Sequence, residues 1–401
     1  MSTNNKASNL STIKTNNRSL VLSLLNKTGQ ISRADLARAT GLTKTSITNI
    51  INELIHEGII CEIGSTETSS GRKPLLLTLV GTAAYAVGVI IGRNYIYANI
   101  VTLNGEVIKE SRINLEPTEN EKTLVSTTFE VIDTVLANSS IEKNKILGIG
   151  VASIGPLDLE KGIIVDPPNF RGLRSIPIVN LIKERYGLKT FIDNDINACS
   201  IGEKLFGNAK HASNFIFVGV GNGIGAGIFL DNALFRGNNG FAGEIGHITI
   251  DVNGDKCPCG NSGCLELYAA IPSILRQVKT AIRFGADSIL INKKDIEWKN
   301  IVDAASEGDT LSVKVIDRLT YYLAVGLVNI VNLYDPDVIY IGNELSIAGK
   351  LFIEQLNELV NRNMLFRTSK HISIEISKFQ DYAPCIGAPS IVLYRFFNGE
   401  L

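Results

Sequence analysis

Residues 257–266 of this chain read Cys257-Pro258-Cys259-Gly260-Asn261-Ser262-Gly263-Cys264-Leu265-Glu266. They follow, after nine intervening residues, the segment Gly243-Glu244-Ile245-Gly246-His247. One imidazole and three thiolates form a tetrahedral ligand set for Zn²⁺, and the glycine and proline residues allow tight turns that bring the sulfur atoms within about 2.3 Å of one metal. The spacing therefore predicts a zinc site formed by His247, Cys257, Cys259 and Cys264. A surface loop that carries reduced thiols is the alternative.

A zinc ion with four protein ligands has no open position for a catalytic water, so the predicted metal would build a loop rather than perform chemistry. Glu244, His247 and Glu266 flank or belong to the ligand set. A metal-bound histidine presents its other ring nitrogen to a polar partner or to a bound molecule. We therefore expect a polar ligand, such as a sugar hydroxyl, beside this loop.

The composition is that of an ordinary soluble protein. The chain has 401 residues, of which 45 % are hydrophobic and 20 % charged, and this length predicts two or three domains with sizeable cores. No apolar run reaches about 18 residues and the N-terminus lacks a signal-peptide pattern, so we expect no membrane segment. Cys61, Cys199 and Cys385 are widely separated and are interpreted as buried free thiols, which favours a reducing, cytoplasmic location.

The first 80 residues differ from the rest in charge and in pattern. Nine Lys and Arg against five Asp and Glu give residues 1–80 a net charge of +4, although the whole chain carries −1. Apolar residues at helical spacing predict a first helix over 18–27. They are Leu20, Val21, Leu24 and Leu25. Ser32 and Asp35 form a capping box for a second helix, which Gly41 ends.

A third helix is predicted after Thr43, which can cap it. One of its faces is apolar and is formed by Ile47, Ile50, Ile51, Leu54 and Ile55. The opposite face is polar, as expected of a helix that lies in the major groove of DNA. Two strands, over 58–63 and 74–79, follow as a wing. Residues 1–80 are therefore predicted to be a winged helix-turn-helix domain, and a three-helix bundle with a solvated third helix is the alternative.

The predicted DNA-binding residues are those with side chains on the outer face of this domain or at the wing tip. They are Arg33, Lys44, Thr45, Thr48, Asn49, Asn52, Arg72 and Lys73. Asn49 and Thr45 are the strongest candidates for contacts with base edges. Arg72 and Lys73 lie where two cations can meet the phosphate backbone or a minor groove, which adds affinity more than sequence readout.

From residue 83 the chain becomes rich in predicted strands punctuated by glycine. Strands are predicted over 86–92, 95–103 and 106–113, and Asn104-Gly105 is a strong hairpin signal. The same outline returns over 215–220, 225–230 and 233–236. Helices are predicted over 120–136 and 310–332. The pattern indicates two similar α/β lobes, 83–200 and 201–401, that face each other across a cleft, the second with the zinc loop and a dimerisation surface.

The whole chain resembles the ROK family of sugar kinases and sugar-responsive transcriptional repressors. The resemblance rests on the winged helix-turn-helix, on the zinc motif and on three further motifs: Pro168-Asn169, Asp193-Asn194-Asp195-Ile196-Asn197-Ala198 and Ala242-Gly243-Glu244-Ile245-Gly246-His247, followed by Glu266. It implies an actin-like, ribonuclease H-like fold of two lobes. It also implies that a monosaccharide is bound by Asn169, Asn194, Asp195, Glu244, His247 and Glu266, whose amide and carboxylate groups suit paired hydrogen bonds to hydroxyls.

The resemblance leaves two classes of function to compare, a sugar kinase and a DNA-binding repressor. Ile90 stands where the family kinases have an aspartate, and Asn222 where their second phosphate loop has a threonine. Residues 341–344 lack a glycine-rich turn for adenosine. The glycines of 219–225 fit a tight β-turn as well as a phosphate loop. We therefore predict no catalytic residues and no enzyme activity, and interpret Asp195, which matches the kinase base, as a sugar acceptor.

Three further segments, 31–34, 71–74 and 202–207, are similar to the xylose repressors of Firmicutes. This similarity implies a repressor of carbohydrate genes, with Zn²⁺ as cofactor and double-stranded operator DNA as partner. The effector would be a monosaccharide, xylose or glucose, which differ by one hydroxymethyl group that the sequence does not discriminate. We expect a homodimer, with a tetramer as the alternative, that leaves its operator when bound sugar shifts the population of conformations.

Overall fold

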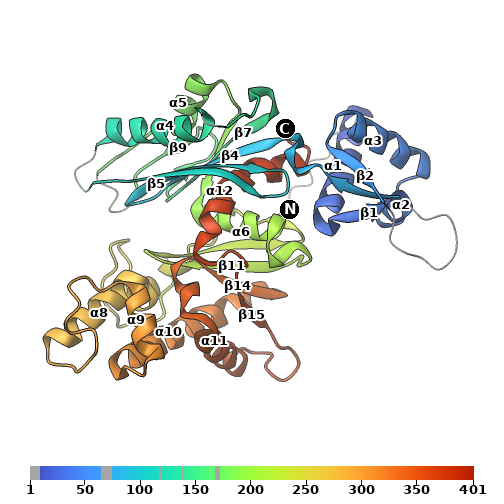
Figure 1. The fold of residues 1–401 in the computed structure, drawn as a ribbon. Helices are drawn as coiled ribbons and strands as arrows, with labels where there is room; N and C mark the ends of the chain where they lie inside the picture. The colour runs from blue at the N-terminus through green and yellow to red at the C-terminus, as the bar shows by residue number, and fades with distance from the viewer. Residues whose placement is uncertain (1–9, 65–74, 117–119, 138, 168–171) are drawn as a thin grey trace. The chain divides into compact units, whose positions relative to one another are not determined.

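The computed structural model describes residues 10–64, 75–116, 120–137, 139–167 and 172–401. The chain packs into two compact units, drawn in Figure 1. The first comprises Met1–Ser153, Pro177–Asp193 and Ala388–Leu401, and the second comprises Ile154–Ile176 and Asn194–Gly387. These units group segments that are far apart in sequence, whereas the domains expected above are consecutive stretches. The division into 1–80, 83–200 and 201–401 therefore stays a prediction.

The N-terminal elements form the expected winged helix-turn-helix. Its helices and strands are α1 (Leu10–Thr28), β1 (Gln30–Ser32), α2 (Arg33–Thr40), α3 (Lys44–His56), β2 (Ile60–Ile63) and β3 (Leu76–Leu79). The strands form an antiparallel sheet in the order β1-β3-β2, with Cys61 opposite Thr78. The two wing strands were predicted, but the short strand β1, which joins them as a third, was not.

The predicted caps set the ends of α2 and α3. The Ser32 hydroxyl accepts a hydrogen bond from the backbone nitrogen of Asp35 at 3.1 Å, which is the N-cap bond of the predicted capping box. Gly41 ends α2 with a φ of 70°, a left-handed conformation that glycine adopts without the steric cost of a Cβ atom. Thr43 accepts from the backbone nitrogen of Ser46 at 3.1 Å and so begins α3.

The core of this domain differs in detail from the predicted one. Ile47, Ile50, Ile51 and Leu54 of α3 are buried, whereas Ile55 is only partly buried. In α1, Leu20 was predicted to face the core but is 44 % exposed, and Leu22 is buried instead. The reason is geometric: Leu22 shares a helix face with the buried Val21 and Leu25, and Leu20 lies outside that arc.

The first unit also contains a five-stranded sheet in the order β10-β7-β4-β5-β6. Its strands are β4 (Tyr85–Ile91), β5 (Tyr95–Thr102), β6 (Val107–Asn114), β7 (Ile146–Ser153) and β10 (Thr190–Asn194). Strands β4, β5 and β6 are antiparallel, and β7 runs parallel to β4. The helices α4 (Glu121–Ala137) and α5 (Ile178–Tyr186) lie on one face, and α12 (Ala383–Phe397) lies on the other (Figure 1).

The second unit repeats this arrangement with a sheet in the order β13-β12-β11-β14-β15. Its strands are β11 (Phe215–Val220), β12 (Ile224–Leu230), β13 (Ala233–Leu234), β14 (Val338–Gly342) and β15 (Ser373–Ile376). Again three consecutive strands are antiparallel and the next runs parallel to the first of them. A separate hairpin pairs β8 (Leu157–Asp158) with β9 (Ile163–Ile164). The predicted internal repeat and the two-lobed α/β fold class are confirmed.

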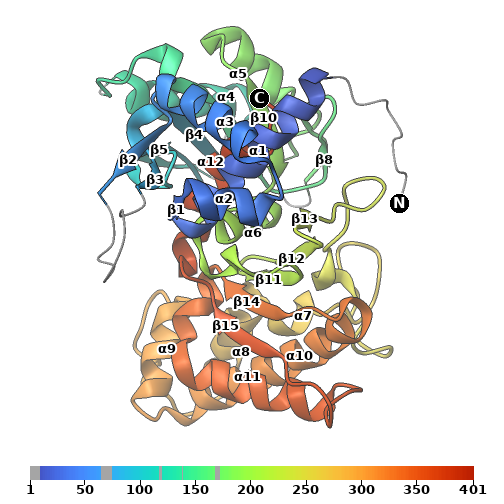
Figure 2. The same cartoon turned by 90° about the vertical axis from the view of Figure 1, so that its right-hand side faces the viewer.

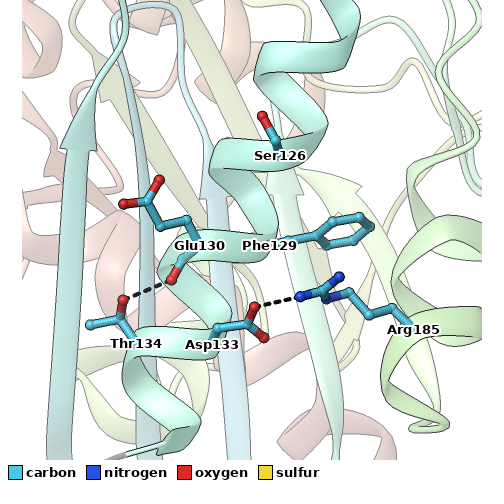
Figure 3. Close-up of a pocket in the computed structure, with 6 residues that line it drawn as sticks. All are labelled: Ser126, Phe129, Glu130, Asp133, Thr134 and Arg185. Carbon is cyan, nitrogen blue, oxygen red and sulfur yellow. Dashed lines mark hydrogen bonds and ion pairs between the residues drawn. The ribbon is translucent and has the colours of Figure 1, made fainter.

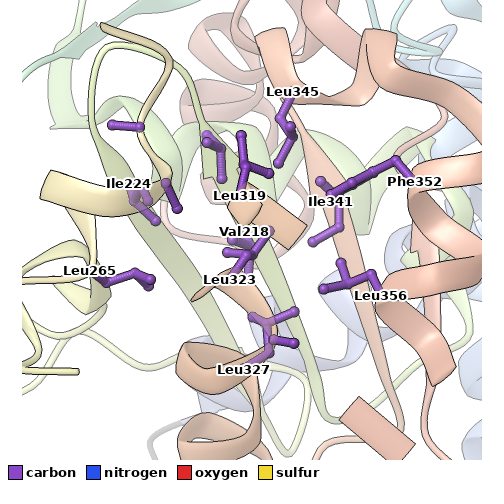
Figure 4. Close-up of a cluster of buried hydrophobic side chains, with 14 of the residues drawn as sticks. Val218, Ile224, Leu265, Leu319, Leu323, Leu327, Ile341, Leu345, Phe352 and Leu356 are labelled. Atoms are coloured by element: carbon purple, nitrogen blue, oxygen red, sulfur yellow. The ribbon is translucent and has the colours of Figure 1, made fainter. Parts of the chain in front are cut away.

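Helices cover both faces of the second sheet. They are α6 (Asp195–Phe206), α7 (Glu266–Ala269), α8 (Ile271–Arg283), α9 (Trp298–Ser306), α10 (Thr310–Tyr334) and α11 (Gly349–Asn363). Helix α6 covers one face, and α10 and α11 cover the other (Figure 2). Between the sheet and α10 lies a continuous apolar core, in which Val218, Leu323 and Ile341 are fully buried (Figure 4). This rigid core holds the loops at the strand ends in place.

Two whole-chain expectations can be compared with this fold. None of the helices in the described ranges is long and apolar enough to span a lipid bilayer. Cys61, Cys199 and Cys385 are not in disulfides, as predicted, but only Cys199 is buried. Cys61 and Cys385 are partly exposed.

Candidate functional site

The four predicted metal ligands converge in the second unit. The ligand atoms of His247, Cys257, Cys259 and Cys264 all lie within 4.8 Å of one another. The Cys257 Sγ is 3.8 Å from the His247 Nδ1, and the Cys259 Sγ is 3.7 Å from the Cys264 Sγ. A tetrahedron with bonds of about 2.3 Å has edges of about 3.8 Å, so these separations fit one tetrahedral metal such as zinc.

The backbone around the cluster explains why the ligands meet. His247 ends a short 3₁₀ helix, Ile245–His247, and the cysteines lie on the loop that follows. The Asn261 Nδ2 donates to the His247 carbonyl at 3.3 Å and to the Thr249 hydroxyl at 2.9 Å. The Cys257 nitrogen donates to the Asn261 carbonyl at 2.8 Å. Asn261 therefore ties the cysteine loop to the histidine, a role that sequence reasoning missed.

The thiols of the cluster are in unlike environments. Burial raises the pKa of Cys264 to about 12 and also raises the pKa of Cys257. A backbone hydrogen bond from Asn261 is the main reason that the pKa of Cys259 is lowered. The four residues of the cluster could hold a divalent cation, whose positive charge would stabilise the three neighbouring thiolates. Because Cys257 faces Nδ1 of His247, Nε2 is the ring nitrogen on the side away from that sulfur.

Two glycines seat the segment before the cluster against β12. A Cβ atom on Gly243 would lie 1.9 Å from the Ala226 carbonyl oxygen, and one on Gly246 would lie 2.4 Å from that of Ile224. The Glu266 Oε2 accepts from the Ile224 nitrogen at 3.3 Å. These contacts bring Glu244, His247 and Glu266 together at the beginning of β12.

The carboxylates of this group influence one another. Burial is the main reason that the pKa of Glu244 is raised; the nearby His247 acts to lower this pKa and the Glu266 carboxylate acts to raise it. Two carboxyl groups and an imidazole that interact electrostatically can donate and accept hydrogen bonds in several directions. This combination suits a polyhydroxylated ligand.

Asn194 and Asp195 approach the same strands from the first turn of α6. The Asn194 Oδ1 caps the helix by accepting from the Ile196 nitrogen at 2.9 Å and the Asn197 nitrogen at 3.3 Å. The side chain of Ile196 rests on the glycines of the adjoining strands, 2.4 Å from where a Cβ of Gly219 would lie. The structure thus places Asn194 and Asp195 on the helix that covers β11 and β12. Asn169, the sixth predicted sugar ligand, lies outside the described residues.

The segment 219–225 forms a tight connection between β11 and β12. The Gly221 nitrogen donates to the Gly223 carbonyl at 3.0 Å. The carboxyl carbon of Glu344 lies 3.6 Å from where a Cβ of Gly221 would be. Burial, followed by the charge of Asp381, raises the pKa of Glu344. Asn222 is exposed, and Ile90, within β4, is 3 % exposed.

The outer face of α3 carries the predicted DNA contacts. Its exposed residues are Lys44, Thr45, Thr48, Asn49 and Asn52. The Thr48 hydroxyl donates to the Lys44 carbonyl of its own helix at 2.8 Å. Arg33 donates to the Glu62 Oε1 at 2.9 Å and to the Asn52 Oδ1 at 3.2 Å, so these three side chains form one group beside the wing. Arg72 and Lys73 lie outside the described residues.

Two ion pairs between α1 and α3 were not foreseen. Lys14 of α1 contacts Glu53 of α3 at 2.8 Å, and Arg18 contacts Glu57 at 2.5 Å. Lys14 and Arg18 were counted in the positive charge of residues 1–80. In the structure they pair with glutamates and join α1 to α3. The charge count alone could not separate cations that pair within the domain from those that face solvent.

A surface hollow of about 340 Å³ on the first unit contains none of the predicted ligands. It is lined by Ser126, Phe129, Glu130, Asp133, Thr134 and Arg185 (Figure 3). Arg185 donates to the Asp133 Oδ2 at 2.6 Å and lies over the Phe129 ring at 4.7 Å. Arg185 and Asp133 are therefore paired with each other, which indicates that they join α4 to α5.

Comparisons with known proteins cover nearly the whole chain. Residues 86–395 match the ROK family, and residues 15–60 match a winged helix-turn-helix DNA-binding family. A putative xylose repressor from Caldicellulosiruptor sp. (strain Rt8B.4) is 33 % identical over 95 % of this chain and 96 % of its own length.

Solved structures give the same picture. A ROK family transcriptional regulator, a homolog of the E. coli MLC protein, superposes with a TM-score of 0.81 at 29 % identity, covering 96 % of this chain and 97 % of its own. A ROK family glucokinase from Streptomyces griseus, in complex with glucose and AMPPNP, superposes with a TM-score of 0.69 at 26 % identity. It covers 77 % of this chain and 99 % of its own, so part of this chain has no counterpart in that kinase.

Proposed function

Because this chain belongs to the ROK family and carries a winged helix-turn-helix domain, we propose that it is a sugar-responsive transcriptional repressor of carbohydrate genes, with xylose as the first candidate effector. The observation that carries the proposal is the exposed polar face of α3, on a correctly capped helix, in the same chain as a ROK domain. A DNA-binding repressor acts where the chromosome is, which supports a cytoplasmic location.

Lys44, Thr45 and Asn49 occupy the first turns of α3, the part of a recognition helix that meets base edges. Arg33 and Asn52 form a second group with Glu62 beside the wing. In the proposed complex Thr45 and Asn49 read bases, and Lys44 and Arg33 contact phosphates. Arg33 would exchange its ion pair with Glu62 for a phosphate, so its net contribution to affinity is smaller than that of an unpaired cation.

The proposed sugar ligands are Asn169, Asn194, Asp195, Glu244, His247 and Glu266. Five of them belong to the second unit as the structure describes it. Asp195 lies at the N-terminus of α6, where the helix dipole favours a carboxylate and keeps it an acceptor of hydroxyl hydrogen bonds. Glu244 and Glu266 accept from further hydroxyls, and Nε2 of His247 completes the set.

The cluster of His247, Cys257, Cys259 and Cys264 holds Zn²⁺ in this proposal, and zinc supplies a cross-link within the loop when bound. The residues around the cluster would hold the His247 imidazole in position. Asn261 fixes the backbone of His247, and the cysteine loop fixes Asn261. A fixed backbone at His247 limits the positions that its imidazole can occupy, and a metal on one ring nitrogen would orient the ring further.

Two protomers are proposed to bind a palindromic operator, each with α3 in one major groove. Bound sugar favours a conformation in which the two recognition helices no longer match the half-site spacing. Such a shift requires different sugar contacts in the two conformations. Operator affinity then falls as sugar binds.

A sugar kinase is the second candidate, because the S. griseus glucokinase is similar over most of the ROK domain and Asp195 matches the position of a general base. Two features count against it. Ile90 has no group that binds Mg²⁺, and the Glu344 carboxyl group beside Gly221 supplies no positive charge to a phosphate at the 219–225 turn. We therefore propose that Asp195 binds sugar and transfers no proton.

The deciding experiment measures binding of the purified protein to DNA upstream of its own gene while D-xylose, D-glucose or N-acetyl-D-glucosamine is added. ATP consumption is followed in parallel. Release by one sugar without ATP turnover supports the repressor and identifies its effector. Sugar-dependent ATP turnover would show that the chain is an active kinase with a DNA-binding domain.

A further inference from the structure

We propose that helix α12 is the coupling element between the sugar residues on α6 and the DNA-binding domain. The inference rests on the proposed function and specifies how its two activities are connected. Helix α12 is one continuous helix that belongs to both units, since residues up to Gly387 pack in the second and residues from Ala388 pack in the first. Three sets of close contacts, one along each part of α12, carry the argument.

The first part of α12 is in backbone contact with α6. A Cβ atom on Gly387 would lie 2.6 Å from the carbonyl carbon of Ala198 and 2.7 Å from the nitrogen of Cys199. A Cβ on Gly202, one turn further along α6, would lie 3.3 Å from the Cα of Gly387. The two helices therefore touch without intervening side chains. Because α6 begins at Asp195, a movement of its first turns reaches α12 directly.

The middle of α12 is held against the sheet of the first unit. A Cβ on Gly150 of β7 would lie 2.2 Å from the Ala388 carbonyl oxygen, and one on Gly88 of β4 would lie 2.3 Å from the Pro389 ring. Closely packed backbone segments cannot move independently, since even small displacements make their atoms overlap. If α12 shifts along its axis or rotates about it, β4 and β7 must therefore move with it, or the contacts at Gly88 and Gly150 are lost.

The end of α12 contacts α1 of the DNA-binding domain. The Ser23 hydroxyl donates to the Phe397 carbonyl at 3.0 Å, across 374 positions of sequence. Gly399, with a φ of 72°, lies directly against α1: a Cβ there would be 2.2 Å from the Ser19 hydroxyl oxygen. Ser19 and Ser23 are one turn apart, so the chain end lies along one face of α1.

These contacts define a path from ligand to DNA. Asp195 begins α6, α6 touches α12, and α12 ends on α1, which the ion pairs Lys14–Glu53 and Arg18–Glu57 join to α3. Each contact joins a rigid helix to the next. Sugar that repositions the start of α6 would thereby change the placement of α3 in the proposed dimer.

The test compares full-length variants in the operator assay with D-xylose, D-glucose and N-acetyl-D-glucosamine. Ser23→Ala removes the hydrogen bond between α1 and α12. Thr28→Ala is the matched control, because Thr28 is exposed and its hydroxyl donates to the Leu24 carbonyl of the same helix at 2.9 Å. Gly202→Ala tests the contact between α6 and the first part of α12. The added methyl group requires the two helices to separate by a few tenths of an ångström. Thermal unfolding and sugar binding to the DNA-free protein are measured for each.

We expect Ser23→Ala to leave sugar affinity of the free protein within twofold of wild type. The sugar-dependent change in operator affinity should fall about fivefold, the size of one net hydrogen bond. Gly202→Ala should also reduce this change, and Thr28→Ala should not. If wild type is released by sugar and both Ser23→Ala and Gly202→Ala are released to the same extent, the coupling role of α12 is overturned and the repressor stands. If no sugar releases wild type, the proposed function itself fails, and the coupling with it.

Discussion

Asn194 and Asp195 are neighbours in sequence, yet the structure gives them different tasks. Asn194 caps α6 through its side-chain oxygen, which accepts from two backbone nitrogens. Asp195 is the first residue of the helix, where its carboxylate is stabilised by the helix dipole. Replacing Asp195 therefore tests ligand binding without removing the cap that starts the helix.

We expect Asp195→Asn to weaken sugar binding by about 10- to 100-fold, because hydrogen bonds to a charged acceptor are each worth about 1.5–3 kcal/mol. Operator affinity without sugar should stay within about twofold of wild type. The measurement is sugar-dependent operator release, with the exposed Asp303→Asn in α9 as the control for the same loss of charge. Unchanged release by Asp195→Asn would remove this residue from the site.

Glu203 is a buried carboxyl group on α6 whose protonation should affect stability. It is 0 % exposed and accepts from the Asn208 nitrogen at 2.7 Å and from the Ser377 hydroxyl at 2.6 Å. Burial raises its pKa despite these hydrogen bonds and the nearby Lys378. The folded protein therefore holds this proton more tightly than the unfolded chain does.

The sign of the pH effect follows from that raised pKa. The contribution of Glu203 to stability is full below its unfolded pKa of about 4.3 and is lost as pH rises through the folded pKa. Glu203→Gln, which keeps an acceptor and has no charge, should gain in unfolding midpoint relative to wild type as pH increases from 4.5 to 7.5. Exposed Glu184→Gln is the control. A constant difference across this range would contradict the assignment.

At the scale of elements, the cysteine loop is a self-contained unit. Its metal ligands, the Asn261 hydrogen bonds and the Gly243 and Gly246 contacts together fix the backbone of His247. The DNA-binding domain shares none of these groups. Loss of metal should therefore affect sugar response before it affects DNA binding.

We expect one zinc ion per chain in the purified protein, measured by elemental analysis, and a loss of zinc in Cys259→Ser. Both that variant and chelator-treated protein should still bind the operator but release it poorly with sugar, because His247 is no longer held in place. Cys61→Ser, a free thiol outside the cluster, should keep both zinc and response. A metal-free protein that still releases its operator normally with sugar would show that the metal has another role.

Helix α3 has a polar face on which the side chains are not equivalent. The Thr48 hydroxyl is bonded within the helix and Asn52 is bonded to Arg33, whereas Asn49 is exposed at the centre of the face. Asn49→Ala should cost about 1–3 kcal/mol at one operator position and reduce selectivity there. Asn363→Ala at the exposed end of α11 is the control. Equal affinity of Asn49→Ala and wild type for all operator variants would exclude base readout by this residue.

At the scale of the whole molecule, the proposed regulation requires two protomers on one operator. Binding of two recognition helices predicts a nuclease footprint with two related half-sites, their centres separated by whole turns of about 10–10.5 base pairs. Sugar should remove protection of both half-sites together, since the shift acts on the dimer. Independent loss of one half-site would indicate that the protomers respond separately.

Features that depend on neighbouring residues could be predicted from the sequence. The Ser32 and Thr43 caps, the Gly41 stop, the strand periodicities and the Cys-x-Cys spacing are all short-range patterns, and the structure has each of them. Local sterics and local hydrogen bonds fix such features in any fold that contains them. The family motifs allowed the fold class to be predicted, because the family matches extend along nearly the whole chain.

Which distant segments meet depended instead on how the whole chain packs. It turned Leu20 outward, added β1 to the wing sheet, and paired Arg33 with Glu62. It also brought the chain end against α1. These outcomes depend on which surfaces pack together and how closely their backbones approach, and no local pattern encodes that. The same reason explains why the sequence could suggest candidate sugar-binding and DNA-binding residues but gave no sign of the contacts of α12 on which the proposed coupling rests.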